Sequence, residues 1–242
     1  MLRSVTNLGC GTLSNMTSRS YLKKLPLAKA WLPIIVVTTI LSVIAGLLGT
    51  LGWVRDAEFS FNQFLNANGN PVLDAVSVFA SDLYSPKWAI VLTLVIMISI
   101  WLKTKSRLDA VLFGALVAAG WLPAQVFKLI FNEARPDQNL LSHKLVPLEV
   151  DAAFPSGHLC FALAIGYGLF LLSRHTRVSK LVLALWILSV PVMGWARLYV
   201  GVHYINDLVG SLFASILGIT AFSAIWNLWL GERISRLRFF NK

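Results

Sequence analysis

The chain has 242 residues, of which 57% are hydrophobic and only 13% are charged, and its formal net charge is +10. Its mean hydropathy of +0.70 excludes an ordinary soluble globular protein and indicates a polytopic membrane protein. In such a protein a basic balance reflects positive residues in cytoplasmic loops, so we expect no nucleic-acid partner.

The N-terminal region predicts a tail followed by a membrane span. Residues 1–30 are polar and basic and lack the apolar core of a signal peptide. No charge occurs from Trp31 to Val54, a run longer than the roughly 20 residues that a spanning helix needs. Further on, residues 59–83 mix apolar and polar side chains around an Asn-Gly-Asn-Pro turn at 68–71, which favours an interfacial helix.

Six apolar segments are predicted to span the membrane, so the expected fold class is all-α with six transmembrane helices. They are residues 31–54, 86–102, 109–131, 156–173, 180–197 and 206–230. The second segment is short, near the lower limit for a spanning helix. One membrane domain, residues 31–230, is then flanked by basic tails at 1–30 and 231–242.

The distribution of charge predicts the orientation. Basic residues gather in both tails and in the loops after the second and fourth segments, whereas most acidic residues fall on the other side. The positive-inside rule therefore predicts that both termini are cytoplasmic. The extracytoplasmic side then receives three polar motifs, each at the junction of a loop and a span.

The first motif is Lys128-x6-Arg135-Pro136. Its two cations are about two helical turns apart, so we expect them on one helix face that Pro136 ends. Arginine binds phosphate oxygens in a bidentate manner, and lysine adds a point charge beside it. Taken alone, the pair also fits two cations that merely reach the membrane interface.

The second motif, Pro155-Ser156-Gly157-His158, opens the fourth span. Proline suits the first helical turn and serine suits the N-cap, so the free N–H groups of this helix start predict an anion site. Gly157 would let a phosphate come close, Ser156 would donate a hydroxyl hydrogen bond, and His158 would protonate a departing oxygen. A plain helix cap beside an interfacial histidine is the alternative.

The third motif, Arg197-x5-His203-x3-Asp207, joins the fifth and sixth spans. The i,i+4 spacing places His203 beside Asp207 at the start of a helix. A carboxylate that fixes one ring nitrogen leaves the other as a nucleophile toward phosphorus, while Arg197 clamps the phosphoryl oxygens. A structural His–Asp pair at a helix end is the alternative.

No metal or other cofactor is expected, because the ligand types are not clustered and three nearby cations would repel a divalent ion. The cations would themselves neutralise the phosphoryl oxygens. In the long loop 137–154, we expect Asp137, Glu149 and Asp151 to be solvated charges, and a role in shaping the site entrance is the alternative. His143 and His175 have no partner in the sequence and no predicted role.

These motifs resemble the type 2 phosphatidic-acid phosphatase superfamily, whose pattern is Lys-x6-Arg-Pro, Pro-Ser-Gly-His and Ser-Arg-x5-His-x3-Asp. The chain departs from it at Ala196, where the family usually has serine. The resemblance implies that His203 is the nucleophile, that Asp207 orients it and that His158 is the general acid. It also implies a set of phosphate-binding residues, which are Lys128, Arg135, Ser156, Gly157 and Arg197.

We therefore expect a metal-independent phosphatase that acts on a membrane lipid phosphate or pyrophosphate through a phosphohistidine, in a bacterial inner membrane with its site facing outside. Undecaprenyl pyrophosphate or lipid A is favoured, because both expose phosphates outside the cytoplasm. Phosphatidylglycerol phosphate is an alternative substrate, and a lipid phosphotransferase with the same intermediate is an alternative enzyme. A non-catalytic lipid or ion transporter is disfavoured because no inverted repeat is visible. The oligomeric state stays open.

Overall fold

The protein is all-helical in the part of the chain that the computed structural model describes, residues 22, 24–237 and 240, where no strand occurs. This confirms the all-α part of the expected fold class. Most of the predicted N-terminal tail and part of the predicted C-terminal tail lie outside the described residues.

Five helical stretches among the described residues are long and apolar enough to cross a membrane. They are α1 (Trp31–Gly49), α4 (Pro86–Thr104), α5 (Arg107–Phe131), α7 (Ser179–Tyr199) and the stretch Ile205–Ser235. The last one comprises α8 (Ile205–Ile225), a π-helical segment (Trp226–Leu230) and α9 (Gly231–Ser235). A further apolar helix, α6 (Gly157–Ser173), has only 17 residues.

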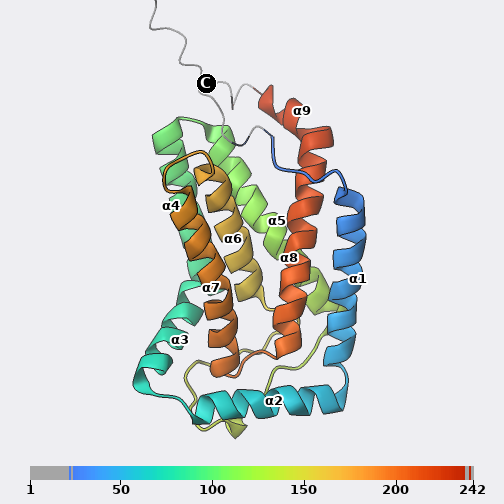
Figure 1. The fold of residues 1–242 in the computed structure, drawn as a ribbon, viewed down its shortest axis with the longest axis vertical. Helices are drawn as coiled ribbons and strands as arrows, with labels where there is room; N and C mark the ends of the chain where they lie inside the picture. Colours follow the sequence, from blue (N-terminus) through green and yellow to red (C-terminus); the bar gives the residue numbers. More distant parts are fainter. Residues whose placement is uncertain (1–21, 23, 238–239, 241–242) are drawn as a thin grey trace, which may run out of the picture.

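The spanning helices form a bundle in which α8 is packed against α1, α5 and α6 (Figure 1). Its centre is filled by apolar side chains such as Phe113 and Leu116 of α5 and Ala164 of α6, all fully buried. By contrast, α7 leaves large apolar side chains such as Leu185 and Leu188 exposed. Contiguous apolar exposure of this kind is expected where the surrounding solvent is lipid.

The apolar run 31–54 does not form a single span, contrary to expectation. Its first helix, α1, ends at Gly49, and a separate helix, α2 (Gly52–Ala67), lies across one end of the bundle (Figure 1). The break has a local cause: Leu51 has extended backbone angles, and the residues after it carry polar side chains on one side of the helix. An amphipathic helix of this kind suits a membrane interface.

Residues 59–83 were predicted to hold one interfacial helix. They contain the second half of α2 and a further helix, α3 (Pro71–Leu83). The turn at 68–70 separates them, and the Asn70 side chain accepts hydrogen bonds from the backbone N–H groups of Val72 and Leu73. Pro71 occupies the first turn of α3, where its missing N–H costs nothing.

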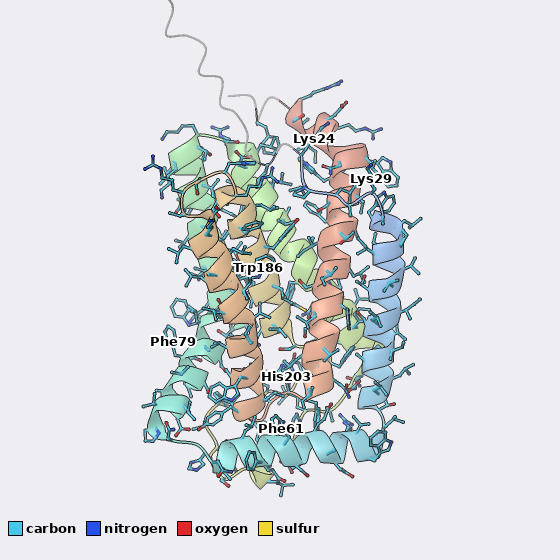
Figure 2. All side chains as sticks on the ribbon, in the orientation of Figure 1. Lys24, Lys29, Phe61, Phe79, Trp186 and His203 are labelled. Atoms are coloured by element: carbon cyan, nitrogen blue, oxygen red, sulfur yellow. The ribbon has the colours of Figure 1, made fainter. Side chains whose placement is uncertain are left out.

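The two ends of the bundle differ. Lys24, Lys29 and α9 lie at one end, whereas His203 and α2 lie at the opposite end, which we call the site end (Figure 2). The described chain therefore begins and finishes on the same side of the bundle.

Candidate active site

The three motifs meet at the site end, each at the end of a helix. Lys128 lies in the last turn of α5 and Arg197 in the last turn of α7. Ser156 precedes α6, and Asp207 lies in the first turn of α8. Residues that are distant in sequence therefore converge because antiparallel helices bring their ends to one face.

His203 lies in the turn between α7 and α8 and not on α8, which begins at Ile205. The expected pairing still forms, because the Asp207 Oδ2 lies 2.9 Å from His203 Nδ1. The same oxygen accepts a hydrogen bond from the backbone N–H of Tyr204 at 2.9 Å, and neither His203 nor Asp207 is exposed. This geometry places the ring proton on Nδ1 and leaves the Nε2 lone pair directed into the site.

The pKa of His203 is well below its ordinary value of 6.5, first because the ring is buried and then because Arg135, Arg197, Lys128 and His158 are nearby. Each effect disfavours the charged imidazolium. The ring is therefore held in its neutral, nucleophilic form.

Arg135 reaches the site from an extended segment, and the expectation that it shares a helix face with Lys128 is wrong. α5 ends at Phe131 because Asn132 adopts a left-handed conformation with φ of 44°, which asparagine tolerates better than most residues. The Arg135 Nη1 then lies 3.1 Å from His203 Nε2, and it also donates to the Val202 carbonyl at 2.8 Å.

The start of α6 departs from the expected capping. Ser156 is the N-cap residue, but its side chain accepts no capping hydrogen bond, and Pro155 precedes the cap instead of entering the first turn. The Ser156 Oγ is buried without a hydrogen-bond partner among the described residues, as is Arg197 Nε. A bound oxyanion would satisfy both groups. Gly157 packs closely on Trp121, since a Cβ at this glycine would lie 3.2 Å from the indole Nε1.

Two loop carboxylates bind the three cations, so the expectation that Glu149 and Asp151 are solvated is wrong. Asp151 lies 2.7 Å from Lys128 Nζ and 2.8 Å from Arg135 Nη2, and it is 59% exposed. Glu149 lies 2.9 Å from Arg135 Nη2, also pairs with Arg197, and is 25% exposed. Clustered cations beside apolar helices attract the nearest anions, and here these belong to the loop before α6.

The same pairing acts on the pKa of Asp151. Burial tends to raise this pKa, but the hydrogen bonds and charges of Lys128 and Arg135 lower it to about 2. Asp151 is therefore ionised throughout the ordinary pH range. Asp137, in contrast, is exposed and contacts only its own turn through the Asn139 N–H, in keeping with a solvated loop charge.

A cavity of about 780 Å³ opens from this cluster. His158, Arg197 and Lys128 line its polar end. The rest of its wall is largely apolar and comes mainly from α4, α5, α6 and the loop residues 146–151, with Ile90, Leu94, Val117, Trp121 and Phe161 among the lining residues. Ile90 and Leu94 are also exposed on the outer surface of α4, so the cavity borders the lipid-facing side of the bundle. Its shape and lining suit an apolar chain attached to an anionic head group.

Sequence reasoning missed the residues of α2 that reach the site end. Asn62 Nδ2 donates to the carbonyl of His203 at 2.9 Å, and Glu58 accepts from the backbone N–H of Asn206 at 3.2 Å. Their i,i+4 spacing on an otherwise amphipathic helix was the available signal. The other two histidines stay without a role: the His143 side chain is exposed, and His175 lies in the loop after α6 at the far end. Among the described residues, no three His, Cys, Asp or Glu side chains are grouped as metal ligands.

The fold and the gathered side chains define a class: an integral membrane protein of apolar helices with an oxyanion-binding site and a buried His–Asp pair at one end. Residues 108–230 match the family described as the PAP2 superfamily. The chain belongs to this superfamily, as its motifs predicted, and is a lipid phosphate hydrolase.

Relatives with assigned activities cover much of the chain. The undecaprenyl-diphosphatase BcrC of Bacillus subtilis (strain 168) is 33% identical over 150 residues, which cover 61% of this chain and 72% of that protein. The putative undecaprenyl-diphosphatase YbjG of Escherichia coli (strain K12) is 26% identical over 192 residues, or 76% of this chain and 90% of that protein.

Two solved structures share the fold. The PAP2-type phosphatidylglycerolphosphate phosphatase of Bacillus subtilis superposes with a TM-score of 0.68 and 22% identity, covering 84% of this chain and 98% of that one. LpxE of Aquifex aeolicus superposes with a TM-score of 0.50 and 22% identity, covering 69% and 94% respectively.

Proposed function

We propose that this protein removes phosphate from a membrane lipid phosphate or pyrophosphate through a phosphohistidine on His203, at the extracytoplasmic face. The observation that carries the proposal is the position of His203. Its Nδ1 is fixed by Asp207 at 2.9 Å, and its Nε2 lies 3.1 Å from Nη1 of Arg135, a residue that itself lines the cavity.

In the first step, the Nε2 lone pair of His203 attacks phosphorus and forms an N–P bond. The P–O bond to the leaving group breaks, and His158 gives its proton to the departing oxygen. Lys128, Arg135 and Arg197 hold the phosphoryl oxygens as their charge develops. The Nδ1 proton stays on the ring and donates its hydrogen bond to Asp207, whose carboxylate stabilises the positive charge of the ring.

In the second step, water attacks the same phosphorus while His158 takes a proton from it. The N–P bond breaks, its electron pair returns to Nε2, and inorganic phosphate leaves. These steps use only side chains that line the polar end of the cavity or contact it, and no metal ion or other cofactor enters them.

Undecaprenyl pyrophosphate is the substrate that we favour. Both sequence relatives described above are named undecaprenyl-diphosphatases, and the apolar cavity beside the cation cluster suits a long isoprenoid chain. The phosphates of lipid A and phosphatidylglycerol phosphate are the other candidates. We rank them lower because the two solved structures share only the fold with this chain.

The distribution of charge supports the proposed orientation in the membrane. The site end lies opposite the end that bears Lys24 and Lys29, so the positive-inside rule supports cytoplasmic termini and an outward-facing site. In this arrangement α6, with 17 residues, serves as the sixth span. We propose a bacterial inner membrane, with the basic tails 1–30 and 231–242 in the cytoplasm.

The test is phosphate release by purified protein in detergent with EDTA, over undecaprenyl pyrophosphate, phosphatidylglycerol phosphate, phosphatidic acid and lipid A. His203→Ala should abolish release, whereas His143→Ala, which alters an exposed histidine at the same end, should leave it unchanged. Release of phosphate from one lipid far above the others would name the substrate. Equal activity of wild type and His203→Ala would contradict the proposal.

A further inference from the structure

The turn that carries His203 cannot supply hydrogen-bond partners for all of its own backbone N–H and C=O groups. α7 ends at Tyr199 and α8 begins at Ile205, so the residues between them have no complete helical ladder. This turn is nevertheless buried: Val200, Val202 and His203 are each 0% exposed. A buried carbonyl or N–H group without a partner is costly, so the groups of this turn need donors and acceptors from elsewhere.

Helix α2 supplies several of them from a single face. Asn62 Nδ2 donates to the His203 carbonyl at 2.9 Å, and Asn66 Nδ2 donates to the Tyr199 carbonyl at 3.2 Å. Glu58 accepts from the Asn206 N–H at 3.2 Å, at the start of α8. Residues 58, 62 and 66 are spaced i, i+4 and i+8, so they form one polar stripe along α2.

The stripe is part of a rigid support. Asn66 exchanges hydrogen bonds with the backbone of His143, at 2.7 Å from the N–H and 3.0 Å to the carbonyl. Asn62 and Asn66 are both 0% exposed, whereas Trp53 and Phe64 on the same helix are 73% and 61% exposed. α2 lies across the site end (Figure 1), and its stripe bonds the nucleophile turn, whereas the aromatic side chains of Trp53 and Phe64 are exposed.

Within the described part of the chain, the Asn62 side chain hydrogen-bonds only to His203. Its Nδ2 donates to the His203 carbonyl, and its Oδ1 is buried without a hydrogen-bond partner among the described residues. Asp207 fixes the ring of His203 from one side, while Asn62 fixes the backbone of the same residue from the other.

We propose that Asn62, supported by Glu58, is a positioning residue that holds His203 in line with the phosphorus atom. The inference rests on the proposed role of His203 as the nucleophile. Without Asn62, the turn shifts and the Nε2 lone pair is misaligned, whereas Lys128 and Arg197, which bind the phosphate in the ground state, lie on helices outside this turn. A displacement of about 1 Å costs roughly 100-fold in rate when an attacking atom must be aligned.

The experiment compares Asn62→Ala with Asn68→Ala, the matched control. Asn68 ends the same helix, is exposed, and its side chain bonds only the Phe64 carbonyl of α2 itself. With the lipid pyrophosphate, Asn62→Ala should lower kcat about 10- to 100-fold and leave KM within about threefold. Asn68→Ala should change neither constant. Asn62→Leu, which keeps the packing volume and removes the donor, should behave as Asn62→Ala does.

Inhibition separates positioning from a general loss of structure. Vanadate mimics pentacoordinate phosphorus and requires the His203 nitrogen, so its inhibition constant should rise in parallel with the fall in kcat. Inorganic phosphate needs only the cations, so its inhibition constant should stay within about threefold.

Two outcomes would count against the inference. If Asn62→Ala and Asn62→Leu both match Asn68→Ala in kcat, the inference is wrong. It is also wrong if KM and the phosphate and vanadate constants all rise together, since that pattern indicates a purely structural role. His203→Ala is measured in parallel: if it retains activity, the proposed function fails at its nucleophile, which is distinguishable from a failure at Asn62 alone.

Discussion

At the scale of single residues, the site is built around one neutral imidazole. Asp207 holds its Nδ1, Arg135 lies 3.1 Å from its Nε2, and Asn62 bonds its carbonyl. The ring orientation, the charge state and the backbone position of His203 are therefore each set by a different helix or loop. The chemistry of His203 should therefore depend on burial and nearby cations more than on its intrinsic basicity.

The pH dependence of kcat/KM tests whether burial and the nearby cations keep His203 neutral. His203 must be neutral to attack, so activity falls as pH drops through its pKa, which lies well below 6.5 because of burial and the neighbouring cations. His158 must carry a proton, so activity also falls at high pH. We expect a bell-shaped profile whose acidic limb lies below pH 6.5. An acidic limb at or above that value, or a profile that rises or falls throughout, would contradict this arrangement.

Glu149 and Asp151 should act as competitors of the substrate phosphate, because they pair with the cations that would bind it. Glu149→Gln should tighten inhibition by inorganic phosphate about tenfold, the value of one charged hydrogen bond. Asp151→Asn should have a smaller effect, since that side chain is more exposed.

The measurement is the phosphate inhibition constant, with Asp137→Asn as control because that carboxylate is an exposed loop charge. Weaker inhibition in Glu149→Gln would mean that Glu149 assists phosphate binding instead of opposing it.

At the scale of helices, the site depends on close packing of α5 against α8, which carry Lys128 and Asp207. Gly218 permits this approach: a Cβ there would lie 2.0 Å from the Ala119 carbonyl oxygen. The Ser211 hydroxyl of α8 also lies within hydrogen-bond distance of the Ser156 carbonyl, at 3.1 Å, which ties α8 to the start of α6.

Gly218→Ala should therefore force the two helices apart. We expect a loss of about 1–3 kcal/mol in stability, the usual cost of overpacking, together with reduced activity. Thermal unfolding in detergent and phosphate release would measure both. Gly52→Ala is the control, since a Cβ at Gly52 meets nothing within 4 Å. Equal melting temperatures for the two variants would show that the close approach of α5 and α8 at Gly218 does not limit stability.

How far the sequence predicts this architecture also depends on scale. The apolar runs predicted where the long apolar helices lie, apart from the end of the run 31–54, which belongs to α2. The motifs predicted which side chains gather. Both predictions were possible because hydropathy and short spacings are local properties. The end of α5 was misplaced because the left-handed conformation of Asn132 stops the helix before Pro136 can. The pairing of Glu149 with Arg197 and of Asn62 with His203 joins residues far apart in sequence, so no local pattern could predict it.

At the scale of the whole molecule, the polar chemistry lies at one end of an apolar bundle and the described chain begins and finishes at the other (Figure 1). Single cysteines tested with a membrane-impermeant maleimide should report this sidedness in intact cells. Residues 68 and 142, in loops of the site end, should react from outside. Residues 105 and 177, at the opposite end, should react only after permeabilisation.

The buried Cys160 provides little background in this assay, and Cys10 is replaced by serine. Labelling of residue 105 in intact cells would reverse the orientation and place the site in the cytoplasm.

The central claim, a phosphohistidine formed from a lipid pyrophosphate, is tested most directly by trapping it. Purified protein is mixed with undecaprenyl pyrophosphate labelled in its terminal phosphate, quenched in alkali within milliseconds, and digested to locate the label. We predict an acid-labile, alkali-stable phosphate on the peptide that contains His203, absent in His203→Ala and retained in His143→Ala. Turnover without any protein-bound phosphate, or label that persists in His203→Ala, would contradict the account.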